Sequence, residues 1–308
     1  MATTRQKVPL TAHGFEAFET RRITVDGVTL FLRTGGAVPP LILLHGFPQT
    51  HRAWHRVAAE LSLHFQVVIP DLRGYGQSGA PADDAGHTVY SKRAMARDVT
   101  GLMDALGLRR AHVLGHDRGG RVAYRMALDH PRRIGKLGII EIVPTGDFWA
   151  AWNADIALAA YHWTFLAQPA PLPESLIGKD PVGFLDATLT AWTEAKSLDV
   201  FAPDALRSYR DQMSDPARVA AMCADYRAGA STDRRLDQAD RTAGRMIAAP
   251  LRFLWAEGGF PARTGDPAGI WRRWAADVSH ASCRSGHFVM EENPRAVLDC
   301  FLPFFRDP

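Results

Sequence analysis

The five residues GHDRG, from Gly115 to Gly119, restrict the possible folds of this chain more than any other stretch. A short apolar run over residues 111–114 is typical of a buried strand, and the pattern of residues 121–128 predicts a helix. A strand, a Gly-x-nucleophile-x-Gly turn and a helix together form a nucleophile elbow, whose glycines permit a tight turn. The middle residue is Asp117, and its carboxylate is already a nucleophile at neutral pH. The sequence therefore predicts an enzyme in which Asp117 attacks saturated carbon or an epoxide and forms an ester.

Apolar runs alternate with helical patterns on both sides of this motif. The expected strands are residues 18–25, 28–33, 40–44, 65–69, 137–140, 251–255 and 278–284, and the expected helices include residues 53–61, 91–106, 270–276 and 294–305. This alternation predicts an α/β fold with a mostly parallel sheet and helices on both of its faces. In such a fold, ligands bind at the carboxyl ends of the strands, where the motifs of this chain lie.

Tryptophan, tyrosine and proline are concentrated in residues 144–240, and no further run typical of a buried strand appears before residue 251. We interpret this segment as a helical insertion that covers the sheet as a cap. The predicted domains are therefore a core formed by residues 1–143 and 241–308 and a cap formed by residues 144–240.

Composition argues against several classes of protein. The formal charge of +3 in 308 residues comes without a basic cluster, which argues against a nucleic-acid partner and suits a small anionic substrate. The three cysteines, Cys223, Cys283 and Cys300, are widely spaced, so neither a metal site nor a disulfide framework is expected. Residues 1–14 contain no signal-peptide run, and no apolar run is long enough to span a membrane. We therefore expect a cytoplasmic protein with no membrane partner.

Further residues complete a candidate catalytic set. His287 follows the last expected strand, where the base that serves an elbow nucleophile is expected. The acid that orients its imidazole could follow either of two strands: we expect Glu141, and Glu257 is the rival. The backbone N–H groups of Phe47 and Arg118 are expected to form an oxyanion hole.

Arg118 and Arg121 lie three residues apart at the start of the helix that follows the elbow, so they share the helix face beside Asp117. Two guanidinium groups exceed the charge of one carboxylate by one unit, and an anionic substrate would restore the balance. A guanidinium group binds carboxylate through a planar two-pronged contact. The pair therefore predicts a substrate that carries a carboxylate.

Five stretches of the chain resemble one known family. They are HGFPQTHRAW (45–54), GHDRGGRVAYR (115–125), YHWTFLAQPAPLPE (161–174), CADYRAGA (223–230) and SGHF (285–288). By these motifs the chain resembles the fluoroacetate (haloacetate) dehalogenases of the α/β-hydrolase superfamily, over nearly its whole length. The arginine pair and the YHW segment are the more specific signals, because HGFP and SGHF are shared across the superfamily.

The resemblance implies that Asp117 displaces halide from the α-carbon of a haloacetate while the two arginines hold the substrate carboxylate. It also implies that His162, Trp163 and Tyr226 bind the departing halide, and an imidazole N–H, an indole N–H and a phenolic O–H are three suitable donors. It implies a homodimer that requires no metal or organic cofactor. The chain departs from the family at Glu141, where we expect aspartate in other members.

Other functions remain open. An epoxide hydrolase uses the same aspartate and histidine but needs cap tyrosines, for which Tyr161 and Tyr226 are candidates; such enzymes usually carry tryptophan where this chain has Arg118. A haloalkane dehalogenase has a neutral substrate, which would leave the arginine pair without a role. The alternative of another class is a non-catalytic ligand receptor with this fold, and the intact catalytic set argues against it. A serine esterase is disfavoured because the elbow carries no serine.

Overall fold

The computed structural model describes residues 14–307, and in this part of the chain eight strands form one sheet in the order β1-β2-β4-β3-β5-β6-β7-β8. The strands are β1 (Glu19–Val25), β2 (Val28–Gly35), β3 (Pro40–Leu44), β4 (Gln66–Pro70), β5 (Ala111–His116), β6 (Ile134–Ile140), β7 (Leu251–Ala256) and β8 (Val278–Cys283). β2 pairs antiparallel with both β1 and β4, and the other neighbours are parallel. The predicted mostly parallel sheet is therefore confirmed. Most of the expected lead-in, residues 1–13, lies outside the described residues.

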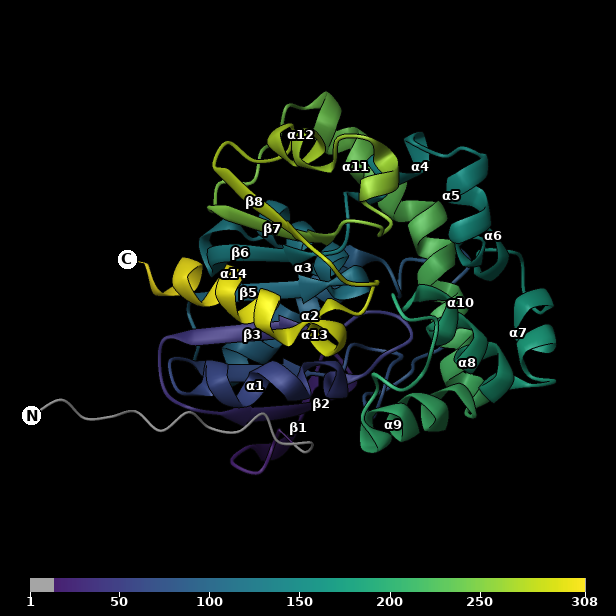
Figure 1. Ribbon diagram of the computed structural model, residues 1–308, viewed down its shortest axis with the longest axis horizontal. Coiled ribbons are helices and arrows are strands. Elements are labelled where there is room, and N and C mark those ends of the chain that lie inside the picture. Colours follow the sequence, from purple (N-terminus) through teal and green to yellow (C-terminus); the bar gives the residue numbers. More distant parts are fainter. Residues whose placement is uncertain (1–13, 308) are drawn as a thin grey trace, which may run out of the picture.

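Helices cover both faces of the sheet, as the continuous apolar strand runs predict. Leu41 and Leu43 of β3 pack on the face covered by α1 (His55–Ser62) and α14 (Pro294–Arg306). The alternate residues of β3, Ile42 and Leu44, belong to the core on the other face, with α2 (Lys92–Ala105) and α3 (Asp117–Asp129). Figure 1 shows α1 and α14 in front of the sheet and α2 and α3 behind it.

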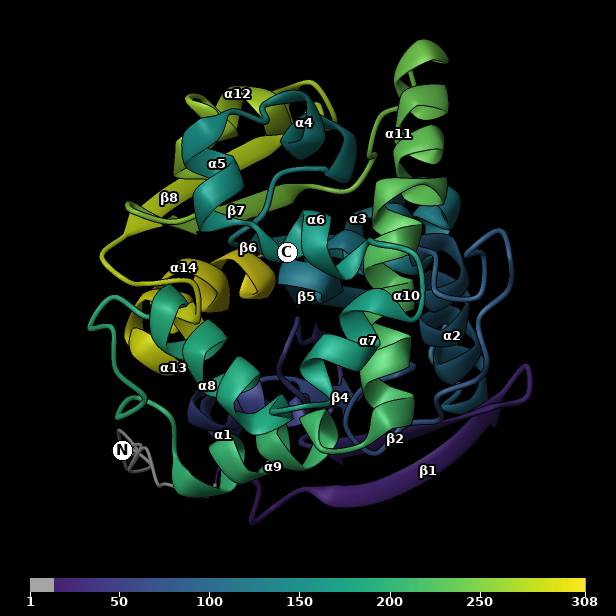
Figure 2. The same ribbon diagram turned by 90° about the vertical axis from the view of Figure 1, so that its right-hand side faces the viewer.

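The chain between β6 and β7 is helical. Its helices are α4 (Thr145–Ala150), α5 (Ala154–Ala159), α6 (His162–Leu166), α7 (Leu172–Ile177), α8 (Pro181–Trp192), α9 (Pro203–Met213), α10 (Pro216–Ala230) and α11 (Thr232–Thr242). Figures 1 and 2 show most of them gathered over one end of the sheet. We refer to residues 144–240 as the cap; its standing as a separate domain remains a prediction.

Several helices begin with an acidic or amide side chain followed by proline. The carboxylates of Asp180, Asp215 and Asp266 accept a backbone N–H from the first turn of α8, α10 and α12 (Pro267–Arg272), respectively. Proline suits the first helical position because its φ is preset and no N–H is needed there. The Asp266 side chain and Pro267 explain why the helix that we expect at residues 270–276 begins three residues earlier in the structure, at Pro267.

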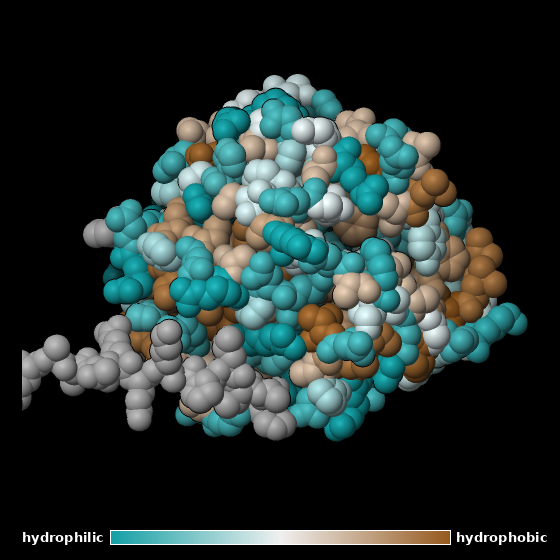
Figure 3. Space-filling model, in the orientation of Figure 1, coloured by the Kyte–Doolittle hydropathy of each residue, from teal (hydrophilic) through white to brown (hydrophobic). Residues whose placement is uncertain are grey.

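The surface of the cap has an apolar portion. On α7, Leu172 and Leu176 are half-exposed, and Figure 3 shows hydrophobic residues toward this edge of the molecule. Within residues 14–307, no helix is long and apolar enough to cross a membrane.

A buried polar contact joins the cap to the core. Glu291, in α13 (Val289–Glu292), is fully buried and accepts hydrogen bonds from the side-chain amide of Gln49 and from Tyr209 Oη in α9. Burial raises the pKa of the Glu291 carboxyl to about 8, so the neutral acid is favoured near neutral pH. The neighbouring His55 has the opposite shift, because burial lowers its pKa to about 4.

We expect Glu291 to make the folding stability pH-dependent. Its folded-state pKa of about 8 exceeds the ordinary value of 4.5, so its contribution is complete below about pH 4.5 and is lost as the pH rises through 8. Relative to the Glu291→Gln variant, the wild type should lose about 1.4 kcal/mol of unfolding free energy per pH unit across this window. Urea unfolding at pH 5.5, 6.5 and 7.5 measures the difference. The exposed Glu19→Gln change is the control, and a pH-independent difference for Glu291→Gln contradicts this account.

Candidate functional site

The GHDRG segment forms the predicted sharp turn between β5 and α3. Asp117 is the first residue of α3 and has a φ of 45°, in the left-handed region that side chains rarely adopt. A side chain on Gly115 would come within 2.5 Å of the Gly119 carbonyl oxygen, and one on Gly119 would overlap the Leu44 carbonyl. The strand–turn–helix prediction is therefore confirmed, and its glycines are required sterically.

One oxygen of the Asp117 carboxylate is held by the backbone. The Phe47 N–H donates to Asp117 Oδ1 at 2.9 Å. Phe47 lies next to the elbow because β3 and β5 are parallel neighbours, with Leu44 opposite Gly115, so their carboxyl ends meet. Gly46 permits this approach, because a Cβ there would overlap the Asp117 side chain.

The His287 ring lies between the other Asp117 oxygen and the Glu141 carboxylate. His287 Nε2 is 3.9 Å from Asp117 Oδ2, and His287 Nδ1 is 3.8 Å from Glu141 Oε1. These separations are longer than direct hydrogen bonds, and neither ring nitrogen has a partner among the described residues. Burial favours the neutral form of Asp117, but the charges of His287 and the two arginines outweigh it and lower the pKa of this carboxyl.

The structure distinguishes between the two candidate acids by position. Glu141, directly after β6, is fully buried and accepts hydrogen bonds from the Ala256 N–H at 2.7 Å and the Phe260 N–H at 3.0 Å. Burial nevertheless raises the pKa of Glu141. Glu257 is exposed and accepts a hydrogen bond from Ser282 Oγ. Gly259 was not among the residues predicted for the site; because it has no side chain, it leaves the space that the Glu141 carboxylate occupies.

The guanidinium of Arg118 is already paired. Its Nε donates to Asp225 Oδ2 at 3.0 Å and its Nη2 donates to both the carboxylate and the backbone carbonyl of Asp225, which lies in α10. Lys92 also forms an ion pair with Asp225. The charge count made from the sequence was therefore incomplete, because it omitted both of these buried groups. The reason is that Asp225 lies 107 residues from Arg118 in the chain.

Arg121 is different, since no carboxylate oxygen within residues 14–307 lies within 4.0 Å of its guanidinium. Its Nη1 donates to the Val143 carbonyl at 3.0 Å and to Thr145 Oγ1 at 3.1 Å, and its buried Nε has no partner. The Trp163 ring lies 4.5 Å from the Arg121 Cζ. Burial, together with the nearby positive charge of Arg118, lowers the pKa of Arg121. A buried cation without a carboxylate partner suits the binding of an anion.

The three candidate halide donors lie together on the cap side. The Tyr226 ring centroid is 5.5 Å from that of His162 and 6.1 Å from that of Trp163, and the Phe47 ring lies 5.2 Å away. Tyr226 Oη and His162 Nδ1 are buried without partners in the described chain. Burial raises the pKa of Tyr226 and lowers that of His162, so a neutral phenol and a neutral imidazole are favoured. Tyr161 is 45% exposed, and its ring centroid lies 6.3 Å from that of His162.

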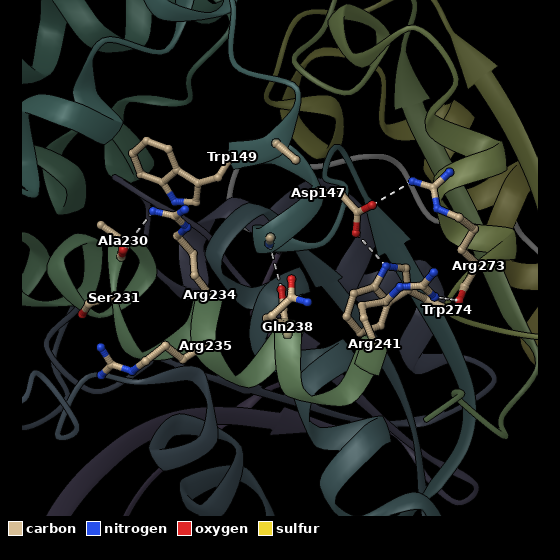
Figure 4. Close-up of a pocket in the computed structure, with 13 residues that line it drawn as sticks. Asp147, Trp149, Ala230, Ser231, Arg234, Arg235, Gln238, Arg241, Arg273 and Trp274 are labelled. Atoms are coloured by element: carbon tan, nitrogen blue, oxygen red, sulfur yellow. Dashed lines mark hydrogen bonds and ion pairs between the residues drawn. The ribbon is translucent and has the colours of Figure 1, made fainter. Parts of the chain in front are cut away.

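Two cavities of the described chain differ in their relation to the candidate site. One, of about 470 Å³, is lined by Tyr161, Trp192, Phe260 and His287 among others and therefore reaches the base. The other, of about 670 Å³, is an exposed basic groove between α4 and α11, lined by Trp149, Asp147, Arg234, Arg235, Arg241, Arg273 and Trp274 among others (Figure 4). None of the candidate catalytic or halide-binding residues lines the basic groove. Within residues 14–307, no group of three His, Cys, Asp or Glu side chains is arranged to hold a metal ion.

Comparisons with known proteins show which family and fold the chain shares. Residues 39–294 match the family described as the alpha/beta hydrolase fold. The chain is 42% identical to a fluoroacetate dehalogenase from Burkholderia sp over 95% of both chains. It is 32% identical to a soluble epoxide hydrolase from Corynebacterium sp. (strain C12), over 91% of this chain and 95% of that protein. A solved structure from Nostoc sp PCC 7120, provisionally classed as an alpha/beta hydrolase, has a TM-score of 0.92 and 41% identity over 96% of this chain and 100% of that one.

We expect a small carboxylate to stabilise the protein by pairing with Arg121. Acetate at about ten times its Kd should raise the midpoint of thermal unfolding by about 2 °C, whereas the neutral isostere acetamide should not. The Arg121→Met variant should lose this difference. Fluorescence-monitored unfolding measures it, and Arg234→Met, in the exposed basic groove, is the control that should keep it. Equal shifts with acetate and acetamide in the wild type would argue against an anion site at Arg121.

Proposed function

Because the chain belongs to the haloacetate dehalogenase family of the α/β-hydrolase superfamily, we propose that it hydrolyses the carbon–halogen bond of 2-haloacids such as chloroacetate and fluoroacetate. The observation that carries this proposal is Arg121, a buried cation without a carboxylate partner that shares a helix face with Arg118 and acts electrostatically on Asp117. A substrate carboxylate supplies the missing counterion. The proposal requires the substrate carbon next to that carboxylate to face Asp117.

In the first step, Asp117 attacks the halogen-bearing carbon. Oδ1 is held by the Phe47 N–H, so the free oxygen is Oδ2. Its electron pair forms the carbon–oxygen bond as the carbon–halogen bond breaks, with inversion at that carbon. The halide leaves toward His162, Trp163 and Tyr226, whose neutral N–H and O–H groups replace the water around a developing anion. No proton is needed in this step.

In the second step, water hydrolyses the aspartyl ester. His287 Nε2 takes a proton from the water, whose oxygen attacks Cγ of Asp117, and Glu141 stabilises the resulting imidazolium. Negative charge develops on the Asp117 oxygen that the Phe47 N–H already contacts, and the Arg118 N–H is the second proposed donor. The carbonyl re-forms and the 2-hydroxyacid leaves with the proton from His287. Asp117 keeps the oxygen of the water and is regenerated as the carboxylate when the second water proton passes to solvent.

The second candidate is an epoxide hydrolase, because several relatives carry that name. That chemistry requires acidic O–H groups near the epoxide oxygen. Of the two tyrosines considered, only Tyr226 is buried, and Tyr161 is 45% exposed. A neutral epoxide also leaves Arg121 without an anion. These observations favour the haloacid, while the cytoplasmic location and the homodimer remain predictions.

The direct test is product release from three substrates. We expect the wild type to release chloride from chloroacetate and fluoride from fluoroacetate, and to form no diol from styrene oxide. Ion chromatography measures the halides, and the Asp117→Asn variant is the blank. Diol formation without halide release would support the epoxide hydrolase instead. In the His287→Asn variant, intact-protein mass spectrometry should detect the carboxymethyl ester on Asp117.

A second prediction concerns the space beside Glu141. A Cβ on Gly259 would overlap the Glu141 carboxylate, whereas a Cβ on Gly258 would have no atom within 4 Å. Gly259→Ala should therefore lower kcat for chloroacetate by about a hundredfold, since the imidazolium loses its oriented partner. Gly258→Ala is the matched control and should retain wild-type kcat. Steady-state chloride release measures both variants, and equal rates would contradict the role of Glu141.

A further inference from the structure

The Asp117 carboxylate is paired with no lysine or arginine of the described chain, although two arginines follow it in the sequence. Among residues 14–307, no lysine or arginine nitrogen lies within 4.0 Å of its oxygens. Arg121 is held by the Val143 carbonyl and Thr145, and Arg118 is held by Asp225. An ion pair on Asp117 would occupy the electrons that it needs for attack. The contacts that hold Arg118 and Arg121 away from Asp117 therefore affect whether its carboxylate is free to attack.

Asp225 is bound from several sides. Its carboxylate accepts hydrogen bonds from Arg118 Nε and Nη2, from Lys92 Nζ and, at 2.7 Å, from Tyr75 Oη. Asp225, Arg118 and Tyr75 are fully buried, and Lys92 is 1% exposed. Asp225 belongs to the cap helix α10, whereas its three partners lie outside the cap. The hydrogen bonds from Nε and Nη2 of Arg118 to Asp225 orient the guanidinium toward α10.

We propose that Asp225 is a positioning residue that holds Arg118 away from Asp117, so that the nucleophile stays unpaired and Arg118 stays available to the substrate carboxylate. This inference rests on the proposed function. Arg118 directly follows Asp117, and its charge already lowers the pKa of that carboxyl. Without Asp225, the Asp117 carboxylate is an anion to which the freed guanidinium can turn.

The opposite expectation also has a physical basis. Loss of Asp225 removes a negative charge and frees the donors of Arg118, which would strengthen the binding of an anionic substrate. The positions decide between the two outcomes. Asp117 is a permanent neighbour inside a buried site, where ion pairs are strong, whereas the substrate must first give up its water. Pairing of Arg118 with Asp117 therefore wins, and turnover falls.

The chain provides a matched control on the same helix. Arg125 lies seven residues after Arg118 on α3, hence on the same face, and is 1% exposed. Arg125 pairs with Asp240 and Asp237 of α11. Like the pair between Arg118 and Asp225, these ion pairs join α3 to a helix in the segment between β6 and β7. Asp240→Asn therefore removes a buried aspartate from an arginine pair without touching the residues around Asp117.

The test is a double-mutant cycle on purified full-length protein. We expect Asp225→Asn to lower kcat/KM for chloroacetate by about tenfold or more, and Asp240→Asn to leave it unchanged. In an Arg118→Gln background, Asp225→Asn should change kcat/KM by less than about twofold, because its effect passes through Arg118. Wild-type kcat/KM in a folded Asp225→Asn variant, or a full additional loss in the double variant, would overturn the proposal. If the Asp225→Asn variant does not fold, the Asp225→Asn/Lys92→Met double variant replaces it. Lys92→Met removes the lysine that would otherwise be buried without its counterion, and the same outcomes support or overturn the proposal.

A second readout separates this inference from the proposed function. If the wild type releases no halide, the proposed function fails, and calorimetric titration with acetate still tests Asp225. We then expect acetate to bind the wild type, and the Asp225→Asn variant to bind it about tenfold more weakly. Equal or tighter binding by the variant, or no binding of acetate by the wild type, would overturn the positioning role.

Discussion

Buried charges at the start of α3 constrain the rest of the site. Asp117, Arg118 and Arg121 are all nearly inaccessible to solvent, and a charge removed from water is costly unless another group compensates it. Arg118 is compensated by Asp225, and Arg121 has only neutral oxygens and an aromatic ring. The two neighbouring arginines therefore differ in their counterions, and this difference is the basis of the proposed anion site at Arg121. Asp117 is paired with neither arginine.

The parallel sheet brings the candidate catalytic groups together. Phe47 follows β3, Asp117 follows β5, Glu141 follows β6 and His287 follows β8, and the carboxyl ends of these strands lie at one edge of the sheet. The cap supplies what the strand ends lack. His162 and Tyr226 are uncharged donors, and Asp225 is an anion. Each layer therefore contributes a different kind of group to the same interior space.

The pattern of neighbouring residues in the sequence was sufficient to predict the sheet and the turn at Asp117. It was not sufficient to predict the buried ion pairs. The apolar runs of β3 and β5 and the glycines around Asp117 reflect steric demands of adjacent residues, which a sequence displays directly. The pairing of Arg118 with Asp225 depends on how α10 docks, and no local spacing encodes that. Gly259 was missed for the same reason, because the group that fills its space, Glu141, belongs to another strand end. The choice of Glu141 over Glu257 agrees with the positions of the two side chains, although its catalytic role remains a prediction.

The absence of a carboxylate partner beside Arg121 among the described residues has a consequence for the end of the proposed reaction cycle. In that reaction the 2-hydroxyacid product would keep the carboxylate of the 2-haloacid, so the guanidinium that attracts the reactant would also retain the product. The halide would be a second anion that has to leave the same enclosed space. On this proposal, the affinity of Arg121 for carboxylate has to be strong enough to hold the reactant and weak enough to release the product.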